Sequence, residues 1–211
     1  ALVIIDMLND FILPEGKLSF EKGQAVVSPI VRLKAAFRAG GWPVLYGADA
    51  HPQDAAEFSD WRPHFQVGSV GAQIVTELSP EAGDIVLYKN SLSLFQDGAA
   101  QRILCGLGVS CLYMVGAATE YSMKHSALDA MACGLTVTMV SGAIAGVDIH
   151  QGDAEQALEA RIDDAIVRGS VKPVSPAQRA GGGATTRLGE RTRWRRAAPG
   201  ERRRPAPGWM V

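Results

Sequence analysis

The sequence has little cysteine and no long hydrophobic run. Its 211 residues include three cysteines, Cys105, Cys111 and Cys133. An odd number without CxxC spacing argues against a disulfide framework and fits a reducing compartment. No apolar run approaches the length that crosses a bilayer, and the apolar start lacks the basic lead of a signal peptide. We therefore expect a cytoplasmic protein that does not interact with membranes.

Signatures of several enzyme classes are also missing. The glycine-rich segment GLGVS (106–110) precedes a strand-like run instead of following one, and no G-x-G-x-x-G opens a helix. The chain has neither a P-loop nor a G-x-S-x-G nucleophile elbow. These absences exclude a dinucleotide-binding Rossmann protein, a P-loop NTPase and a serine hydrolase that carries such an elbow.

Charge is distributed unevenly along the chain. Residues 176–211 carry nine Arg and two Glu, a net charge of +7, whereas residues 1–175 carry a net charge of −8. The segment 173–211 is rich in Arg, Gly, Pro and Ala and has no helical or strand period, so we expect it to be disordered. Only Trp194 stands among its arginines as a stacking aromatic. We therefore favour a solvated extension, or a stretch translated out of frame, over a nucleic-acid-binding arm.

Residues 1–172 alternate short apolar runs with amphipathic ones. The apolar runs predict strands at 2–6, 42–49, 84–89, 111–116 and 136–143. The amphipathic runs predict helices at roughly 24–39, 97–107, 119–133 and 153–167. This alternation predicts one α/β domain with a doubly wound, Rossmann-like and mostly parallel sheet flanked by helices.

Three reactive side chains fall at the ends of the predicted strands. Asp6 closes LVIID, Lys89 closes DIVLYK, and Ser122 lies in the first helical turn after CLYMVG. Each has an ordinary alternative: a turn or capping Asp, a surface Lys, and a helix-start Ser. Ligands in such sheets bind beyond the carboxyl ends of the strands. We therefore interpret the three together as a base, a cation and a nucleophile of one catalytic site.

A second polar set follows the strand that ends near residue 49. Asp49 and His51 are two residues apart, and His64 follows after a loop that contains Glu57. Carboxylate and imidazole ligands suit zinc, manganese or iron. The alternative is a pair of surface histidines in a Pro- and Asp-rich loop. We expect one divalent metal ion, zinc first, on Asp49, His51 and His64, with Glu57 as a candidate fourth ligand.

Four segments resemble the isochorismatase-like hydrolases, and within them most closely the nicotinamidases. The segments are LVIIDMLNDF, DAHP with WRPHFQVGSVGA, YKNSLSLF and VGAATEYSMKHSALDA, and the resemblance covers residues 1–172. It implies catalytic roles for Asp6, Lys89 and position 122, and metal ligation by the set just described. It further implies hydrolysis of a small cyclic amide, such as nicotinamide to nicotinic acid and ammonia, in NAD salvage.

The same resemblance implies further details of the site. It places the oxyanion on backbone N–H groups near Ala118 and Ser122 and a cis peptide bond between Ala117 and Ala118. It also implies a substrate pocket with Phe11, Trp61, Ala117 and Tyr121 in its wall. Members of the family commonly form homo-oligomers, so we expect one here, with a small-molecule amide as the other partner.

The chain departs from the family at its most important position, because the family's nucleophile is a cysteine and this sequence has Ser122. None of the three cysteines occupies an equivalent place. A hydroxyl is far less acidic than a thiol and needs a base during the attack itself. We therefore expect activity reduced by several orders of magnitude. The alternatives are a non-catalytic binding protein and a hydrolase of another small amide.

A second departure is Phe65, where the family usually has a non-catalytic cysteine. The segment after Lys89 is also shorter than in typical nicotinamidases. Both differences lie near the predicted site, so we expect the substrate pocket to differ in shape.

Overall fold

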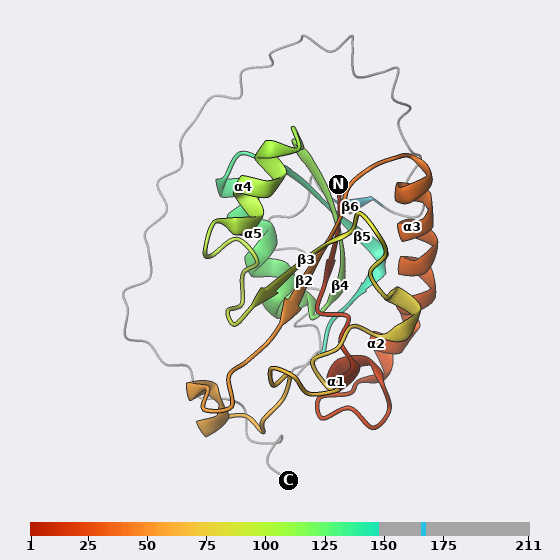
Figure 1. Ribbon diagram of the computed structural model, residues 1–211. Helices are drawn as coiled ribbons and strands as arrows, with labels where there is room; N and C mark the ends of the chain where they lie inside the picture. Colours follow the sequence, from red (N-terminus) through yellow and green to blue (C-terminus); the bar gives the residue numbers. More distant parts are fainter. Residues whose placement is uncertain (148–165, 168–211) are drawn as a thin grey trace, which may run out of the picture. The chain divides into compact units, whose positions relative to one another are not determined.

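The computed structural model describes residues 1–147 and 166–167, and a parallel sheet forms its centre (Figure 1). The strand order is β3-β2-β1-β4-β5-β6. The strands are β1 (Leu2–Ile5), β2 (Val44–Asp49), β3 (Ile85–Lys89), β4 (Cys111–Ala117), β5 (Thr136–Ala145) and β6 (Ile166–Val167). All neighbouring strands are parallel. The predicted doubly wound α/β class and the five predicted strands are confirmed.

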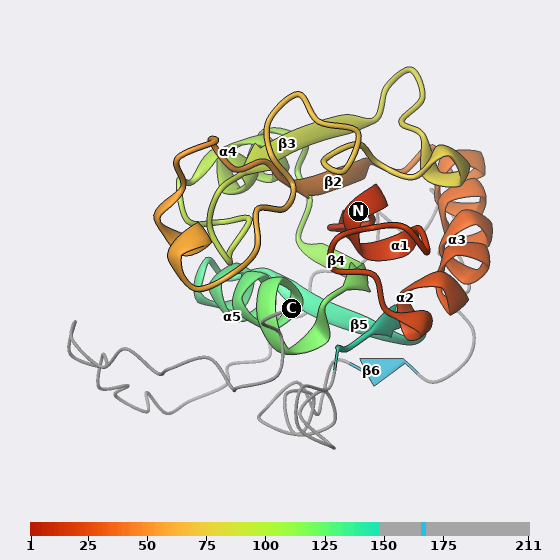
Figure 2. The same ribbon diagram turned by 90° about the horizontal axis from the view of Figure 1, so that it is seen from below.

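Helices cover both faces of the sheet, as Figures 1 and 2 show. On one face α3 (Val27–Ala39) packs Ile30 and Phe37 against Leu2 and Ile4 of β1. On the other face α4 (Ala99–Gly106) and α5 (Lys124–Ala132) pack against the intervening residues of β1. Every residue of β1 and β2 is buried, which explains why their sequences are continuously apolar rather than alternating.

The remaining helical segments are short. They are α1 (Asn9–Ile12), α2 (Glu21–Ala25), the 3₁₀ turns Ala56–Ser59 and Thr76–Leu78, and a π-helical turn at Thr119–Met123 that leads into α5. The helix predicted at 24–39 is interrupted at Val26, which separates α2 from α3.

Two predictions concern the C-terminal part of the chain. The helix predicted at 153–167 is wrong in its last two residues, because Ile166 and Val167 pair with β5 as strand β6; its other residues lie outside the described part. The predicted disordered segment 173–211 also lies outside it. Within the described residues, no helix combines the length and apolarity needed to cross a membrane.

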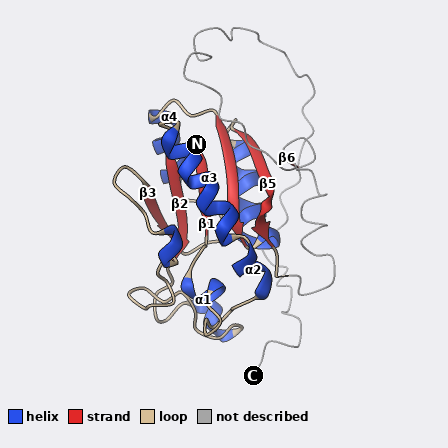
Figure 3. Ribbon diagram, turned by 90° about the vertical axis from the view of Figure 1, so that its right-hand side faces the viewer, coloured by secondary structure: helices blue, strands red, loops and turns tan. Residues whose placement is uncertain are grey.

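The carboxyl ends of the strands gather at one end of the sheet, where α1 also lies (Figure 3). Asp49 of β2 is the direct register partner of Lys89 of β3, and Asp6 follows the last residue of β1. Gly116 allows β4 to approach β1 closely, because a Cβ atom there would overlap the carbonyl oxygen of Ile5. Its φ of +122° also requires glycine. Residues far apart in sequence therefore meet at this end.

Candidate active site and metal centre

Lys89 is the centre of a buried polar cluster. Its Nζ lies 2.9 Å from Oδ2 of Asp6, 2.6 Å from Oδ1 of Asp49 and 3.1 Å from Oγ of Ser122. The carbonyl oxygen of Ser91 lies 3.2 Å away and is the most distant of the four acceptors. Lys89 is 8% exposed and Ser122 is 4% exposed. The ammonium therefore joins two carboxylates and the predicted nucleophile in a place largely shielded from water.

Asp6 is fixed by its backbone as well as by Lys89. Its Oδ1 accepts a hydrogen bond from the backbone N–H of Asp49 at 2.9 Å, so both carboxylate oxygens have donors. Its own N–H donates to the carbonyl of Gly47. Asp6 has φ of +47°, in the left-handed region that few residues other than glycine adopt. Such conformations persist where surrounding bonds hold them, and they cluster at functional sites.

The proximity of the two carboxylates shifts the pKa values of Asp49 and Lys89. Burial, and then the neighbouring charge of Asp6, raise the pKa of Asp49 from 3.8 to about 7. Burial lowers the pKa of Lys89, but the charges of Asp6 and Asp49 outweigh burial and leave that pKa raised. The cluster therefore keeps its ammonium and holds Asp49 close to its titration point near neutral pH.

Ser122 lies in the π-helical turn that follows β4. The peptide bond between Ala117 and Ala118 is cis, as the sequence resemblance implies. The carbonyl of Ala118 accepts hydrogen bonds from the N–H groups of Tyr121 and Met123, which closes the turn around Ser122. Because Oγ accepts a hydrogen bond from Lys89, the hydroxyl proton is free to point to another acceptor.

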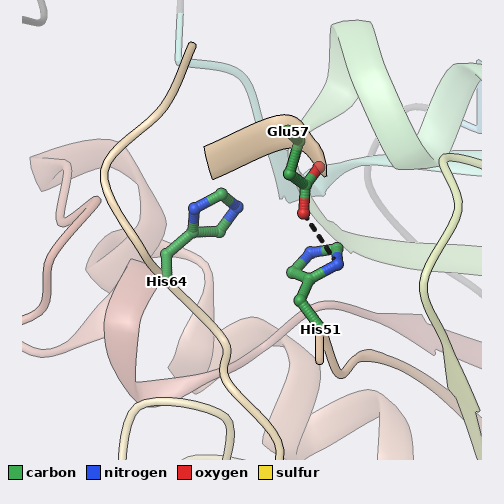
Figure 4. Close-up of side chains that lie close together, drawn as sticks. All are labelled: His51, Glu57 and His64. Atoms are coloured by element: carbon green, nitrogen blue, oxygen red, sulfur yellow. Dashed lines mark ion pairs between the residues drawn. The ribbon is translucent and has the colours of Figure 1, made fainter. Parts of the chain in front are cut away.

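The second cluster consists of His51, Glu57 and His64 (Figure 4). One ligand atom from each lies within 4.8 Å of the others. Both histidines are buried, whereas the Glu57 side chain is 39% exposed. Nδ1 of His64 lies 2.8 Å from the carbonyl of Arg62, which leaves Nε2 as the nitrogen for a ligand. Metal-binding histidines commonly donate their second ring nitrogen to a carbonyl in this way.

Charge couples the members of this cluster. Burial lowers the pKa of His51, but its close contact with Glu57 and the charge of Asp49 outweigh burial and raise it. The contact with His51 lowers the pKa of Glu57. Burial lowers the pKa of His64, which favours its neutral form. A neutral imidazole and an ionised carboxylate are the protonation states that bind a metal.

These residues fit a divalent ion. Oε1 of Glu57 is buried and lies 2.7 Å from Nδ1 of His51, yet within the described structure it has no hydrogen-bond partner of good geometry. A buried carboxylate oxygen that makes no well-aligned hydrogen bond and faces two imidazoles suits a cation. Oδ2 of Asp49 lies 3.9 Å from Nε2 of His51, while Oδ1 pairs with Lys89. Asp49 therefore lies between the two clusters. Glu57, the candidate fourth ligand, is the carboxylate that the structure groups with both histidines.

The residues predicted to wall the substrate pocket come from several different elements. Ala117 is buried at the end of β4, and Trp61 and Tyr121 are half-buried. Phe11 packs edge-on against Phe65, with ring centroids 4.7 Å apart. A cavity of about 790 Å³ lies along β3, and among the predicted site residues Lys89 alone lines it. Because the predicted nucleophile and the histidines do not line this cavity, we do not assign it to the substrate.

Two residues that contact the site, Phe58 and Asp10, are not among those predicted from the sequence. The Phe58 ring packs against both histidines, with centroids 6.0 Å from His51 and 5.6 Å from His64. Asp10, the second acidic residue of LVIIDMLNDF, is buried and binds the backbone beside His64. An acidic residue next to an apolar Phe-Ile pair is the signal that could have identified Asp10; Phe58 has no comparable signal.

Comparison with known proteins places this site in context. The isochorismatase domain model matches residues 1–163. The nicotinamidase of Escherichia coli is 26% identical over 188 residues, covering 74% of this chain and 88% of that protein. A probable inactive nicotinamidase of Arabidopsis thaliana is 27% identical, covering 71% and 83%. The crystal structure of a Pyrococcus horikoshii pyrazinamidase in complex with zinc has a TM-score of 0.72 at 28% identity, covering 78% and 95%.

Proposed function

The chain belongs to the isochorismatase family of hydrolases, and we propose that it is a nicotinamidase-like amidohydrolase whose turnover is limited by Ser122. The proposed reaction converts the carboxamide of a small cyclic amide, with nicotinamide as the first candidate, to the acid and ammonia. The observation that supports this most is the buried cluster in which Lys89 contacts Asp6, Asp49 and Ser122. The His51, Glu57 and His64 cluster next to it would hold a divalent ion, zinc first.

The residues of the cluster divide the chemistry among them. The nucleophile at position 122 forms a bond to the amide carbon, and its proton passes to Asp6. Asp6 then gives that proton to the departing nitrogen as the C–N bond breaks and ammonia leaves. Water next attacks the acyl-enzyme, which releases the acid and restores the nucleophile. Lys89 stabilises the negative charge that develops on the nucleophile and on Asp6.

Backbone N–H groups near Ala118 and Ser122 are proposed to hold the oxyanion. A divalent ion would be held by His51, Glu57 and His64, with Asp49 as a further candidate ligand, and it would supply a Lewis acid next to the substrate. The residues proposed to enclose the ring are Phe11, Trp61, Ala117 and Tyr121.

Ser122 weakens the first step. A thiol next to an ammonium at a helix start ionises near neutral pH, whereas a hydroxyl must lose its proton during attack. The base available to it is the carboxylate of Asp6, which is already hydrogen-bonded by Lys89 and by the Asp49 N–H. We therefore propose that substrate binding is retained and that the chemical step is slow.

Ammonia release from nicotinamide tests the proposal, measured side by side for the protein and its Ser122→Cys variant with zinc supplied. We expect the Ser122→Cys variant to be faster by about 10³-fold. The double variant Ser122→Cys with Lys89→Met is the matched control. Compared under conditions in which circular dichroism shows both variants folded, it should lose this gain because the ammonium is gone. Equal, fast turnover by the unsubstituted chain and by Ser122→Cys would show that serine is a competent nucleophile and that the assigned role of Ser122 is wrong.

A second candidate is a small-molecule-binding protein without turnover. The observation that favours it is the hydrogen bond from Lys89 to Oγ of Ser122. This bond engages a lone pair of the neutral hydroxyl and makes the oxygen a poorer nucleophile. Binding of nicotinamide without ammonia release by either form would favour this candidate. Turnover of another small amide, such as a carbamoyl or maleamic compound, by the Ser122→Cys variant alone would move the substrate assignment within the family.

A further inference from the structure

Asp10 is a buried carboxylate that the proposed reaction does not use. It lies in α1 and is 4% exposed. Its Oδ2 accepts a hydrogen bond from the backbone N–H of Phe65 at 2.9 Å, and its Oδ1 accepts one from the N–H of Lys17 at 3.3 Å. Burial of an ionised carboxylate is unfavourable unless such donors compensate it. Both donors are backbone groups of loops, so the carboxylate holds loop backbone in place.

Phe65 connects Asp10 to both histidines of the metal cluster. It directly follows His64, and its carbonyl accepts a hydrogen bond from the N–H of His51 at 2.9 Å. The N–H of Val67 donates back to the carbonyl of His51, which forms an isolated parallel bridge between His51 and Gln66. One short stretch of backbone therefore sets the spacing of His51 and His64.

Phe65 adopts a conformation that needs this support. Its φ is +43°, in the left-handed region, which is unfavourable for a residue with a bulky side chain. The conformation turns the chain sharply immediately after His64. Because the N–H of Phe65 donates to Asp10 and its carbonyl accepts from His51, the turn is held from both sides.

Gly71 fixes the position of the Asp10 carboxylate. A Cβ atom at Gly71 would overlap Oδ2 of Asp10, and the N–H of Asp10 donates to the Gly71 carbonyl at 3.0 Å. The same oxygen that binds Phe65 therefore rests directly on the glycine backbone. A side chain at position 71 would displace the carboxylate from Phe65.

We propose that Asp10 is a positioning residue for the metal centre, and that it sets the separation of His51 and His64 through the backbone of Phe65. This rests on the proposed function in one respect, namely that His51, Glu57 and His64 hold a divalent ion. Asp10 itself does not contact that ion in this proposal. Gly71 is part of the same arrangement, because the absence of a side chain there leaves the space that the Asp10 carboxylate occupies.

Zinc affinity tests the proposal, measured by competition with a chromophoric chelator at a temperature well below unfolding. The proteins compared are the unsubstituted chain, Asp10→Ala, Asp10→Asn, Gly71→Ala and the control Gly142→Ala, whose added Cβ meets no atom within 4 Å. We expect Asp10→Ala and Gly71→Ala to weaken zinc binding by about 10- to 100-fold, as the loss of groups that orient metal ligands generally does. Asp10→Asn keeps an oxygen for the Phe65 N–H and should weaken binding by about threefold or less. Gly142→Ala should bind as the unsubstituted chain does.

Two results would overturn this proposal in distinguishable ways. If the unsubstituted chain binds zinc and both Asp10→Ala and Gly71→Ala bind it equally well, Asp10 has no positioning role, even if the melting temperature of the zinc-free variants falls. If the unsubstituted chain binds neither zinc nor manganese, the metal centre of the proposed function fails and the positioning role fails with it. Should Asp10→Ala not fold, the contrast between Gly71→Ala and Gly142→Ala decides the question.

Discussion

The two polar clusters of this protein lie side by side but are built differently. Asp6, Asp49 and Lys89 stand at the ends of neighbouring strands, where ladder hydrogen bonds fix the backbone. His51, Glu57 and His64 come from the irregular segment that follows β2, and Glu57 is 39% exposed. The first cluster is positioned by the sheet itself. The second depends on additional bonds, chiefly those made by the backbone of Phe65.

Because the two clusters are built differently, we expect changes in them to affect different properties, namely the stability of the fold and the affinity for a metal ion. Buried charges satisfied by one another are costly to separate, because removing one partner leaves the others unpaired and away from water. In the loop cluster the charged partner of His51 is Glu57, whose side chain is 39% exposed and can find water instead. Changes in the strand-end cluster should therefore affect folding, and changes in the loop cluster should mainly affect metal binding.

The largest effect is expected from Lys89→Met. The change leaves the carboxylates of Asp6 and Asp49 buried without their cation. We expect the free energy of unfolding to fall by about 3–5 kcal/mol. Urea denaturation in the presence of a chelator measures this. An unchanged denaturation midpoint would show that the strand-end cluster is not a major stabilising feature and does not differ in this respect from the loop cluster.

The next effect concerns pH. Burial and Asp6 raise the pKa of Asp49 from 3.8 to about 7, so between these values the folded protein binds more protons than the unfolded chain. The free energy of unfolding should therefore decrease as pH rises from about 4 to 7, with a contribution from this group of at most about 1.4 kcal/mol per pH unit. Unfolding at several pH values with chelator present measures the slope.

Asp49→Asn is the control for this pH effect, because the amide does not titrate. The raised pKa of His51 contributes in the same direction, since its stabilising charge is lost as pH rises. Because part of the raised pKa of His51 comes from the charge of Asp49, the difference between the slopes of the two proteins reports Asp49 together with its influence on His51. Identical slopes would mean that the carboxyl of Asp49 titrates normally in the folded protein.

A smaller effect is expected from Glu57→Gln in the loop cluster. The amide keeps the shape of the side chain but removes the charge that faces His51. We expect zinc affinity to fall about tenfold, a change of about 1.4 kcal/mol, while the stability of the zinc-free protein changes by less than about 1 kcal/mol. Chelator competition and urea denaturation on the same samples test both halves. A loss of stability comparable to that of Lys89→Met would remove the distinction between the clusters.

The smallest effect is expected from Trp61→Ala, made in the Ser122→Cys background. Trp61 is half-buried on the loop that carries the metal cluster, and its backbone N–H donates to the carbonyl of Glu57. If Trp61 walls the pocket as proposed, it should contribute equally to the binding of substrate and transition state. We expect KM to rise about threefold to tenfold with little change in kcat. A large loss of kcat instead would assign Trp61 to the chemical step.

The sequence predicts the strand-end cluster better than the loop cluster. Asp6 and Lys89 close apolar runs, and parallel strands bring such ends together, so their proximity follows from the element order alone. Glu57 is different, because the separation of groups along an irregular loop does not set their distance in space. The sequence offers it as a candidate ligand, and the structure places it against His51.

The sequence by itself determined the parallel α/β sheet and the family, and it put forward Asp6, Lys89 and Ser122 as the candidate catalytic residues. Those properties depend on local periodicity and short motifs, which the chain carries in order. Only the tertiary structure decided that Asp49 pairs with Lys89 and titrates near neutral pH, that Phe65 takes a left-handed conformation, and that Asp10 binds beside His64. Each of these depends on distances and burial between residues that are remote in sequence, and no local pattern specifies them.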